Sequence, residues 1–429
     1  MRTSNAAVAL AALICCAVAP AHEARFAAFG EIPADRRDRE DETLGAIGSG
    51  AAFDPAGGEF LFISDRGPGD GKMDYRPRFD SVCVSESQGR LSFQISSTTL
   101  LRDADGKAMT GLIPDVRDAD FPRMRDGRRC IDPEAIAIAP DGSLFVSDEY
   151  GPFLYHFSRA GRMLRCIQPP AHYLPRAANG RVNFSDNGTL VSGRVPNRGF
   201  EGMTLSPDGK RAVLALQSGL AQDGGKKSRF TRILVLDAES GKPLAEYAYP
   251  FDDAHEINAR ARLSPDEALS QKNLCITEIA AVNDHQFLVL ERDNRGADGS
   301  PDPKPAIQKC VYIIDLNGAT NLLARAGKAL RDDASFVPVR KALLLNLASA
   351  LPGIKTQELA EKWEALALTP PDANGHRKLL VAADNDFLTP RLHIEGHDIQ
   401  FVRAQRPLCS QVLLFNVVLS PPTVVLPGQ

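Results

Sequence analysis

The sequence predicts an all-β protein, a β-propeller of four-stranded blades with short helical insertions, and three observations support this prediction. In a pattern that recurs along the chain, an apolar strand, a turn and a second apolar strand lead to an acidic or polar end. Asp141-Gly142 and Asp208-Gly209 separate alternating apolar runs, which is typical of tight hairpin turns. Further strands follow most of the hairpins, and radial repetition of four-stranded sheets is the architecture of a β-propeller.

Five segments carry the repeat, and most of them begin with a glutamate. They are residues 48–65, 134–148, 201–217, 278–291 and 364–384. Additional strands are expected at 153–158, 232–237, 244–249 and 310–315. The strands 25–32 and 411–419 are expected to share one blade and close the ring. The sequence therefore predicts five blades, or six if a long insertion holds a degenerate blade. A β-sandwich is the alternative, but it would not explain the repeated register.

Two insertions between the repeats show helical patterns. Ser264-Pro265-Asp266-Glu267 has the form of a capping box with proline at the first helical position, and predicts a short helix toward Lys272. Residues 342–350 and 356–363 carry apolar residues at helical spacing, with a break at Pro352 and Gly353. We expect both insertions to cover one face of the propeller.

The N-terminus predicts an export signal over residues 1–21. Arg2 precedes the apolar stretch 6–18, and Ala19-Pro20-Ala21 supplies a small-x-small cleavage pattern before His22. The apolar stretch is too short for a membrane anchor, and no other part of the chain is apolar over the length of a span. Residues 22–429 are then a single propeller domain, which we expect to be secreted or periplasmic.

Removal of the signal leaves six cysteines, and an even number after export fits a disulfide-permissive compartment. They are Cys83, Cys130, Cys166, Cys275, Cys310 and Cys409. Cys83–Cys130 and Cys275–Cys310 are the expected disulfides, because each pair falls within one repeat. Buried free thiols are the alternative.

Composition and motifs exclude several classes of function. Lys and Arg number 50 against 54 Asp and Glu, for a net charge of −4, so the chain has no electrostatic footprint for nucleic acid. A Gly-x-Ser-x-Gly elbow, a P-loop and a dinucleotide fingerprint are all absent from the sequence. A serine hydrolase of the elbow type is therefore not supported.

The repeats should gather carboxylates at one mouth of the central channel. A turn centred on Asp141 places Glu134 beside Asp148, at the end of the hairpin opposite the turn. If the first strand of each repeat lines the channel, the equivalent acids converge there. They are Asp65, Glu134, Asp148, Glu149, Glu201, Glu278, Glu291, Glu364, Asp384 and Asp386.

So many carboxylates cannot all stay ionised without a partner, which can be a hard cation, arginine or shared protons. Calcium suits many oxygen ligands, and the glutamates that begin four repeats are the expected ligands: Glu134, Glu201, Glu278 and Glu364. The expected catalytic bases are Asp148, Glu149 and Asp384. Arg66, Arg198 and Arg292 accompany the acids and are expected to hold an anionic substrate. Alternatively, each glutamate accepts backbone amides of the neighbouring blade and is structural.

The motifs around these residues resemble the phytase-like family, which is described by the esterase-like activity of phytase. They are Asp132-Pro-Glu-Ala-Ile-Ala, Ser147-Asp-Glu-Tyr-Gly-Pro152, Asn197-Arg-Gly-Phe-Glu-Gly202, Leu290-Glu-Arg-Asp-Asn294, Lys362-Trp-Glu-Ala-Leu366 and Ala383-Asp-Asn-Asp-Phe387. The resemblance extends from about residue 40 to 418. It implies an exported propeller connected with the hydrolysis of phosphate or other esters.

Three functions are consistent with these features. The first is a secreted, monomeric hydrolase that acts on a small phosphate ester, with calcium at the channel mouth polarising the phosphoryl oxygen. The second is a gluconolactonase-like hydrolase, which uses the same acids on a lactone and has less need of arginine. The third is a non-catalytic propeller that binds a ligand or a protein, in which case metal would change nothing.

Overall fold

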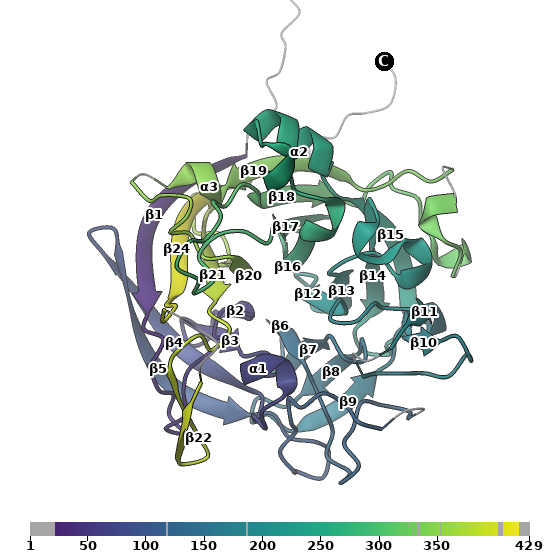
Figure 1. Ribbon diagram of the computed structural model, residues 1–429, viewed down its shortest axis with the longest axis horizontal. Coiled ribbons are helices and arrows are strands. Elements are labelled where there is room, and N and C mark those ends of the chain that lie inside the picture. The colour runs from purple at the N-terminus through teal and green to yellow at the C-terminus, as the bar shows by residue number, and fades with distance from the viewer. Residues whose placement is uncertain are drawn as a thin grey trace, which may run out of the picture.

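The computed structural model describes residues 22–116, 119–185, 188–325, 327–332, 335–351, 353–401 and 406–419. The predicted signal over 1–21 lies outside these residues. The described chain is mostly β-sheet with few helices, which confirms the predicted all-β class. Its sheets stand around a central axis (Figure 1).

Three four-stranded antiparallel sheets follow one another along the chain. The first holds β6 (Pro133–Ile138), β7 (Leu144–Asp148), β8 (Leu154–Phe157) and β9 (Met163–Ile167). The second holds β12 (Phe200–Leu205), β13 (Arg211–Leu216), β14 (Phe230–Asp237) and β15 (Pro243–Pro250). The third holds β16 (Cys275–Ala281), β17 (Gln286–Arg292), β18 (Lys309–Asp315) and β19 (Arg340–Asn346).

Eight strands form one larger sheet in the order β2-β3-β4-β5-β1-β24-β21-β20. Their bounds are β1 (Glu23–Ile32), β2 (Gly50–Asp54), β3 (Glu59–Ile63), β4 (Arg78–Ser87), β5 (Arg90–Leu100), β20 (Lys362–Leu368), β21 (His376–Asp384) and β24 (Ser410–Val418). β5 and β1 meet through a single parallel bridge, Phe29 to Arg90, so the sheet consists of two sets of four strands. Two small hairpins lie outside these sheets: β10 (Arg176–Ala177) with β11 (Leu190–Ser192), and β22 (Arg391–Ile394) with β23 (His397–Gln400).

The first and last described strands meet in the larger sheet, because β1 pairs with β24 in antiparallel register from Glu23–Val418 to Ile32–Ser410. This confirms the predicted pairing of the first and last strands.

One strand from each set of four lies next to the axis, and these strands form a closed ring. β2 contacts β6, β6 contacts β12, β12 contacts β16, β16 contacts β20, and β20 contacts β2. Glycine permits the close approach: a Cβ on Gly50 would lie 2.4 Å from the Glu134 carbonyl oxygen, and one on Gly202 would lie 2.8 Å from the Glu278 carbonyl carbon. Apolar clusters fill the space between the sheets, and the fully buried Trp363 belongs to one of them.

The helices differ from the prediction. Residues 264–272 hold two 3-10 turns, Pro265–Glu267 and Gln271–Asn273, whereas the helix α2 (Ala254–Ala261) precedes them. Asp253 caps α2 by accepting a hydrogen bond from the His255 amide. The structure also contains the short helix α1 (Pro68–Gly71).

The predicted helix over 342–350 is wrong for most of its length. β19 continues to Asn346, and only α3 (Leu347–Ala350) is helical. The leucines of this segment pair with β18, where Leu343 lies opposite Tyr312 and Leu345 opposite Val311. The segment 356–363 passes through turns into β20.

The disulfide prediction is not supported, because all six cysteines from Cys83 to Cys409 are free. Cys275 and Cys310 lie on β16 and β18, with β17 between them. Two strand spacings are about 10 Å, beyond the ~7 Å that a disulfide can bridge between Cα atoms. The Cys83 thiol instead donates a hydrogen bond to Glu59 at 2.9 Å, and Cys130 is buried next to a different sheet.

We therefore expect six reactive thiols in protein that begins at His22. Denaturation and alkylation without a reductant should modify every one of them, and intact-mass measurement should give the same mass shift when reductant is added first. A larger shift after reduction would show that disulfides are present.

Candidate functional site

β-Bulges direct the channel carboxylates, and they recur in four of the five ring strands. The register shifts between Phe200 and Gly202 in β12, and between Trp363 and Ala365 in β20, so that Glu201 and Glu364 are the additional residues. In β6 the shift lies between Pro133 and Ile136 and includes Glu134. A bulge breaks the alternation of a strand and redirects a side chain. The repeated glutamate is therefore built into a repeated backbone irregularity.

β16 carries its bulge one residue earlier than the sequence repeat suggests. The register shifts between Ile276 and Glu278, so Thr277 takes the position of the bulge glutamates. The Thr277 hydroxyl donates to the Trp363 carbonyl at 2.8 Å. Glu278 accepts hydrogen bonds from the amides of Met203 and Ile279, at 3.1 and 2.9 Å. Glu278 thus joins neighbouring ring strands, as the structural alternative expects, and does not lie with the other glutamates.

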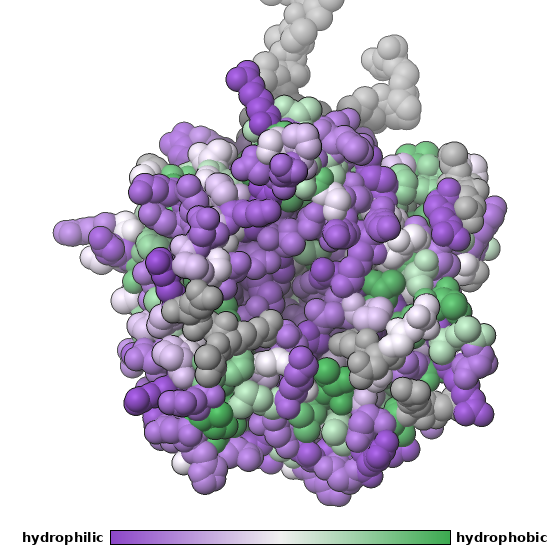
Figure 2. All heavy atoms as spheres, in the orientation of Figure 1, coloured by the Kyte–Doolittle hydropathy of each residue, from purple (hydrophilic) through white to green (hydrophobic). Residues whose placement is uncertain are grey.

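Two groups of carboxylates could each hold a metal ion, since within each group the oxygens lie within 4.8 Å of one another. The Glu134 group consists of Asp132, Glu134 and Glu149, and all three are buried. The Asp384 group consists of Asp65, Asp384 and Asp386. On the face drawn in Figure 2, the centre of the molecule is hollowed and hydrophilic.

The Glu134 group is only partly neutralised. Asp132 accepts hydrogen bonds from the Arg66 amide at 3.0 Å and from Arg66 Nη1 at 2.9 Å. Glu149 accepts from the Gly199 amide at 3.2 Å. Within the described chain, no hydrogen bond or ion pair reaches the Glu134 carboxylate. Burial raises the pKa of Glu134 well above its usual range, and repulsion from Glu201, Asp132 and Glu149 adds to this effect.

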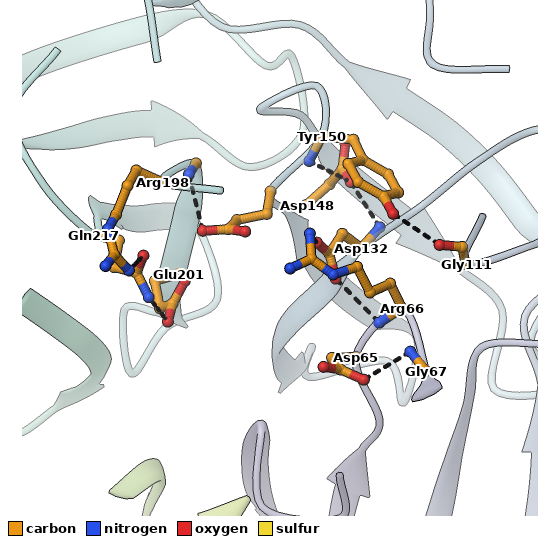
Figure 3. Close-up of polar contacts among 12 residues, drawn as sticks. Asp65, Arg66, Gly67, Gly111, Asp132, Asp148, Tyr150, Arg198, Glu201 and Gln217 are labelled. Carbon is orange, nitrogen blue, oxygen red and sulfur yellow. Dashed lines mark hydrogen bonds and ion pairs between the residues drawn. The ribbon is translucent and has the colours of Figure 1, made fainter. Parts of the chain in front are cut away.

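Glu201 lies close enough to this group to be repelled by it. Burial raises the pKa of Glu201, and repulsion from the Glu149 carboxylate raises it further. Gln217 donates to Glu201 Oε1 and itself accepts from Arg198, so the three side chains form a chain of contacts (Figure 3). Glu201 Oε2 is buried and has no hydrogen-bond partner in the part of the chain that the structure describes. A buried oxygen without a partner is costly, and a bound cation would remove that cost.

A lysine enters the Asp384 group. Lys362 Nζ lies 2.5 Å from Asp386 Oδ1 and 3.7 Å from Asp384 Oδ2. Asp65 accepts from the Gly67 amide at 2.7 Å, and burial, followed by repulsion from Asp132, raises the pKa of Asp65 to about 8. This group therefore carries its own internal counterion.

Two of the predicted bases, Asp148 and Asp384, already have partners: backbone amides for Asp148 and a lysine for Asp384. Asp148 is fully buried and accepts from the amides of Asp132, Tyr150 and Gly151, at 3.0, 3.1 and 2.7 Å. Burial raises the pKa of Asp148 to about 7, although the three amides favour its ionised form. Asp384 lies beside Lys362. Glu149 is the predicted base that lies within a group lacking a lysine.

The three predicted arginines neutralise the acids. Arg66 contacts Asp132, Arg198 reaches Glu201 through Gln217, and Arg292 Nη2 donates to Glu364 at 2.5 Å. Glu291, another expected channel acid, lies elsewhere, since it accepts from the Tyr249 hydroxyl at 2.9 Å and from Lys341 at 2.8 Å.

Asp132 and Lys362 were absent from the predicted site residues, although a signal for both exists in the sequence. Each stands two residues before a bulge glutamate, Asp132 before Glu134 and Lys362 before Glu364. Where no bulge is known, as from the sequence alone, residues two apart in a strand are expected to share a face. The position two before each repeated glutamate was therefore also a candidate for the channel.

The chain matches known proteins over most of its length. A family model described as "Phytase-like: Esterase-like activity of phytase" matches residues 42–387. A relative from Arthroderma benhamiae, named an uncharacterized secreted protein, is 30% identical over 451 aligned residues, covering 84% of this chain and 86% of the relative.

Two solved structures show a distant likeness. A hydrazine synthase of Kuenenia stuttgartiensis is 10% identical with a TM-score of 0.30, over 80% of this chain and 78% of that one. A protein of unknown function from Bacteroides caccae is 11% identical with a TM-score of 0.29, over 82% of this chain and 72% of that one. The family match spans well over half of the sequence, and the chain therefore belongs to the phytase-like family, described by the esterase-like activity of phytase.

Proposed function

We propose that the protein is a secreted, monomeric hydrolase of small phosphate or other esters, a five-bladed propeller that binds one calcium ion at the Glu134 group. The observation that carries this proposal is the Glu134 carboxylate, which is buried among four other acids and lacks a basic partner in the described chain. Secretion is supported by the predicted signal over 1–21 and by the name of the Arthroderma benhamiae relative. None of the described helices is long and apolar enough to cross a membrane.

The residues fit a hard cation. The donors are carboxylate oxygens only, and calcium takes six to eight oxygen ligands in flexible geometry. Asp132, Glu134 and Glu149 would hold the ion, and the orphaned Glu201 Oε2 supplies a further oxygen nearby. Glu278, an expected ligand, is left out because it lies outside the Glu134 group, where its Oε1 accepts hydrogen bonds from two backbone amides. Glu364 is left out because it also lies outside this group, where it accepts a hydrogen bond from Arg292.

The side chains around the ion have separate tasks. A cation bound at the Glu134 group would supply Lewis acidity toward an ester oxygen. Glu149 uses one oxygen for the Gly199 amide, and its carboxylate is the proton acceptor of the proposed reaction. Arg198 is partly exposed, and it is the cation that attracts an anionic substrate. Asp148 holds the turn that carries Glu149, since its carboxylate binds the Tyr150 and Gly151 amides.

Calorimetric titration with calcium chloride tests the metal site, and we expect one ion per chain. Excess calcium should also raise the melting temperature, since ligand at a hundredfold excess over Kd stabilises by about 2.7 kcal/mol. Hydrolysis of nitrophenyl phosphate, nitrophenyl acetate and a sugar lactone, each with and without a chelator, tests the activity. Calcium-dependent turnover of the lactone alone would favour the gluconolactonase-like alternative.

A non-catalytic binding propeller is the second candidate, and the pairing of Arg66 and Arg292 with Asp132 and Glu364 favours it. Such pairs neutralise the channel without an outside ligand. This candidate moves ahead if the protein binds no divalent cation at millimolar concentration and hydrolyses none of the three compounds.

A further inference from the structure

The two carboxylate groups of the channel differ in how their charge is balanced. Each brings three acids within ligand distance of one another. The Glu134 group has an arginine on Asp132 only, whereas a lysine ammonium lies among the acids of the Asp384 group. The channel thus contains two places of similar geometry, of which one is already supplied with a cation.

The backbone fixes the position of this ammonium. Lys362 is the first residue of β20 and lies directly opposite Asp384 of β21 in the antiparallel register. Its Nζ reaches Asp386 Oδ1 at 2.5 Å, and the lysine side chain is 28% exposed against 1% for Asp384. Strand pairing therefore places the lysine beside the acids, and the contact with Asp386 holds its ammonium there.

The lysine does not satisfy all of the oxygens that surround it. Asp384 Oδ1 accepts from the Asp386 amide at 2.7 Å, but Asp384 Oδ2 is buried and makes no hydrogen bond within the described chain. Its nearest ion-pair partner is Lys362 Nζ at 3.7 Å, beyond hydrogen-bond distance. An ammonium donates three hydrogen bonds, whereas a divalent ion of calcium type gathers six or more oxygens. The buried Asp384 Oδ2 is an acceptor that a metal would use and the lysine leaves unbonded.

We propose that Lys362 is a tethered cation that occupies a second metal site, formed by Asp65, Asp384 and Asp386, and so limits the channel to one metal ion. This inference rests on the proposed function for the first site, at the Glu134 group. Loss of the ammonium leaves Asp384 and Asp386 without their lysine partner, and a divalent ion from solution then takes its place.

The test is the number of calcium ions bound per chain, measured by calorimetric titration and by native mass spectrometry. We expect one ion for the wild type and two for Lys362→Met, which is one atom shorter than lysine, keeps its unbranched shape and removes its charge. Lys362→Arg retains a cation and should bind one ion. Lys355→Met is the matched control, since Lys355 is 77% exposed and pairs with Glu358 at the surface. It should also bind one ion.

The possible results separate this inference from the proposed function. A count of one for both the wild type and Lys362→Met overturns the tethered-cation inference, and so does a count of two for the wild type. No ion in the wild type and one in Lys362→Met would refute the proposed metal site at Glu134 and support the inference. No ion in either protein overturns both.

Lys362→Met could fail to fold without metal, because it leaves buried carboxylates uncompensated. Circular dichroism of Lys362→Met and Lys362→Gln, with a chelator and with calcium chloride, covers this case. If calcium restores the folding of either variant, the inference is supported, because the metal then replaces the lysine. Two variants that stay unfolded in excess calcium overturn it.

Discussion

Glu134→Gln is expected to weaken calcium binding by at least about tenfold and to stabilise the metal-free protein. Changes to residues that only support a metal ligand already cost 10- to 100-fold in affinity, so the loss of a charged ligand should cost no less. Without metal, the same change removes a buried carboxyl group whose ionised form is repelled by Glu201, Asp132 and Glu149. The metal-free variant should therefore melt at a higher temperature than the wild type.

The gain in stability should depend on pH, and its sign follows from the raised pKa of Glu134. The folded protein holds this proton more tightly than the unfolded chain, so the wild type loses stability as pH rises above the ordinary glutamate pKa. Glutamine does not titrate. The difference in melting temperature should vanish near pH 4 and increase as the pH rises from 4 to 8. Melting curves with a chelator at the two pH values measure it.

Glu278→Gln is the matched control, because Glu278 is an equally buried glutamate whose pKa is also raised by burial. Its carboxylate accepts hydrogen bonds from two backbone amides and lies apart from the Glu134 group. Calcium affinity should stay within about twofold of the wild type, which is less than 0.5 kcal/mol. Equal losses of calcium affinity in Glu134→Gln and Glu278→Gln would contradict the bulge-based assignment of the site.

Arg232→Met is expected to destabilise the protein by about 3–5 kcal/mol, because it removes the cation of a buried ion-pair network and leaves the carboxylates in place. Arg232 is 1% exposed at its side chain and donates two hydrogen bonds to Asp223, at 2.7 and 2.8 Å. It also donates to Glu246, which lies 3.1 Å from His172. The variant leaves two carboxylates buried without their guanidinium.

Denaturant unfolding measures this loss, and Arg340→Met controls for the removal of an arginine. Arg340 pairs with Asp315 at 2.9 Å, but its side chain is 72% exposed, and such surface pairs contribute less than about 1 kcal/mol. If the two variants were equally stable, the Arg232 network would contribute no more than a surface ion pair. Calcium binding should be unchanged in both.

Much of the fold could be predicted because it follows from local chemistry that repeats. The Asp141-Gly142 turn forms its hairpin as predicted, but the bulge in β6 shifts the register, so that Pro133 rather than Glu134 lies opposite Asp148. The helix over 342–350 could not be predicted correctly. A short run of leucines fits a helix or a strand, and only the pairing of Leu343 and Leu345 with β18 decides for the strand.

The part of the site that depends only on the position of a residue along its strand could be predicted from the sequence. Glu134 and Glu201 are neighbours in the channel, as the repeat suggested. Glu278 was aligned with them by sequence, but the bulge of β16 falls on Thr277, and the composition of a strand does not reveal where its bulge lies. The arginines were correctly associated with the acids, whereas the use of Arg66 and Arg292 as internal counterions depends on distances that spacing does not give.

The pairing of β1 with β24 has a consequence for the order of events during synthesis. Glu23 and Val418 are ladder partners, although nearly the whole chain separates them. Contacts of such sequence separation form slowly, since a very long loop must close first. The ring therefore cannot close until the ribosome has made the last strand, and any earlier product of translation exposes the open edges of β1 and β21. A chain truncated before Ser410 would keep those edges permanently, and aggregation rather than a smaller stable ring is its expected fate.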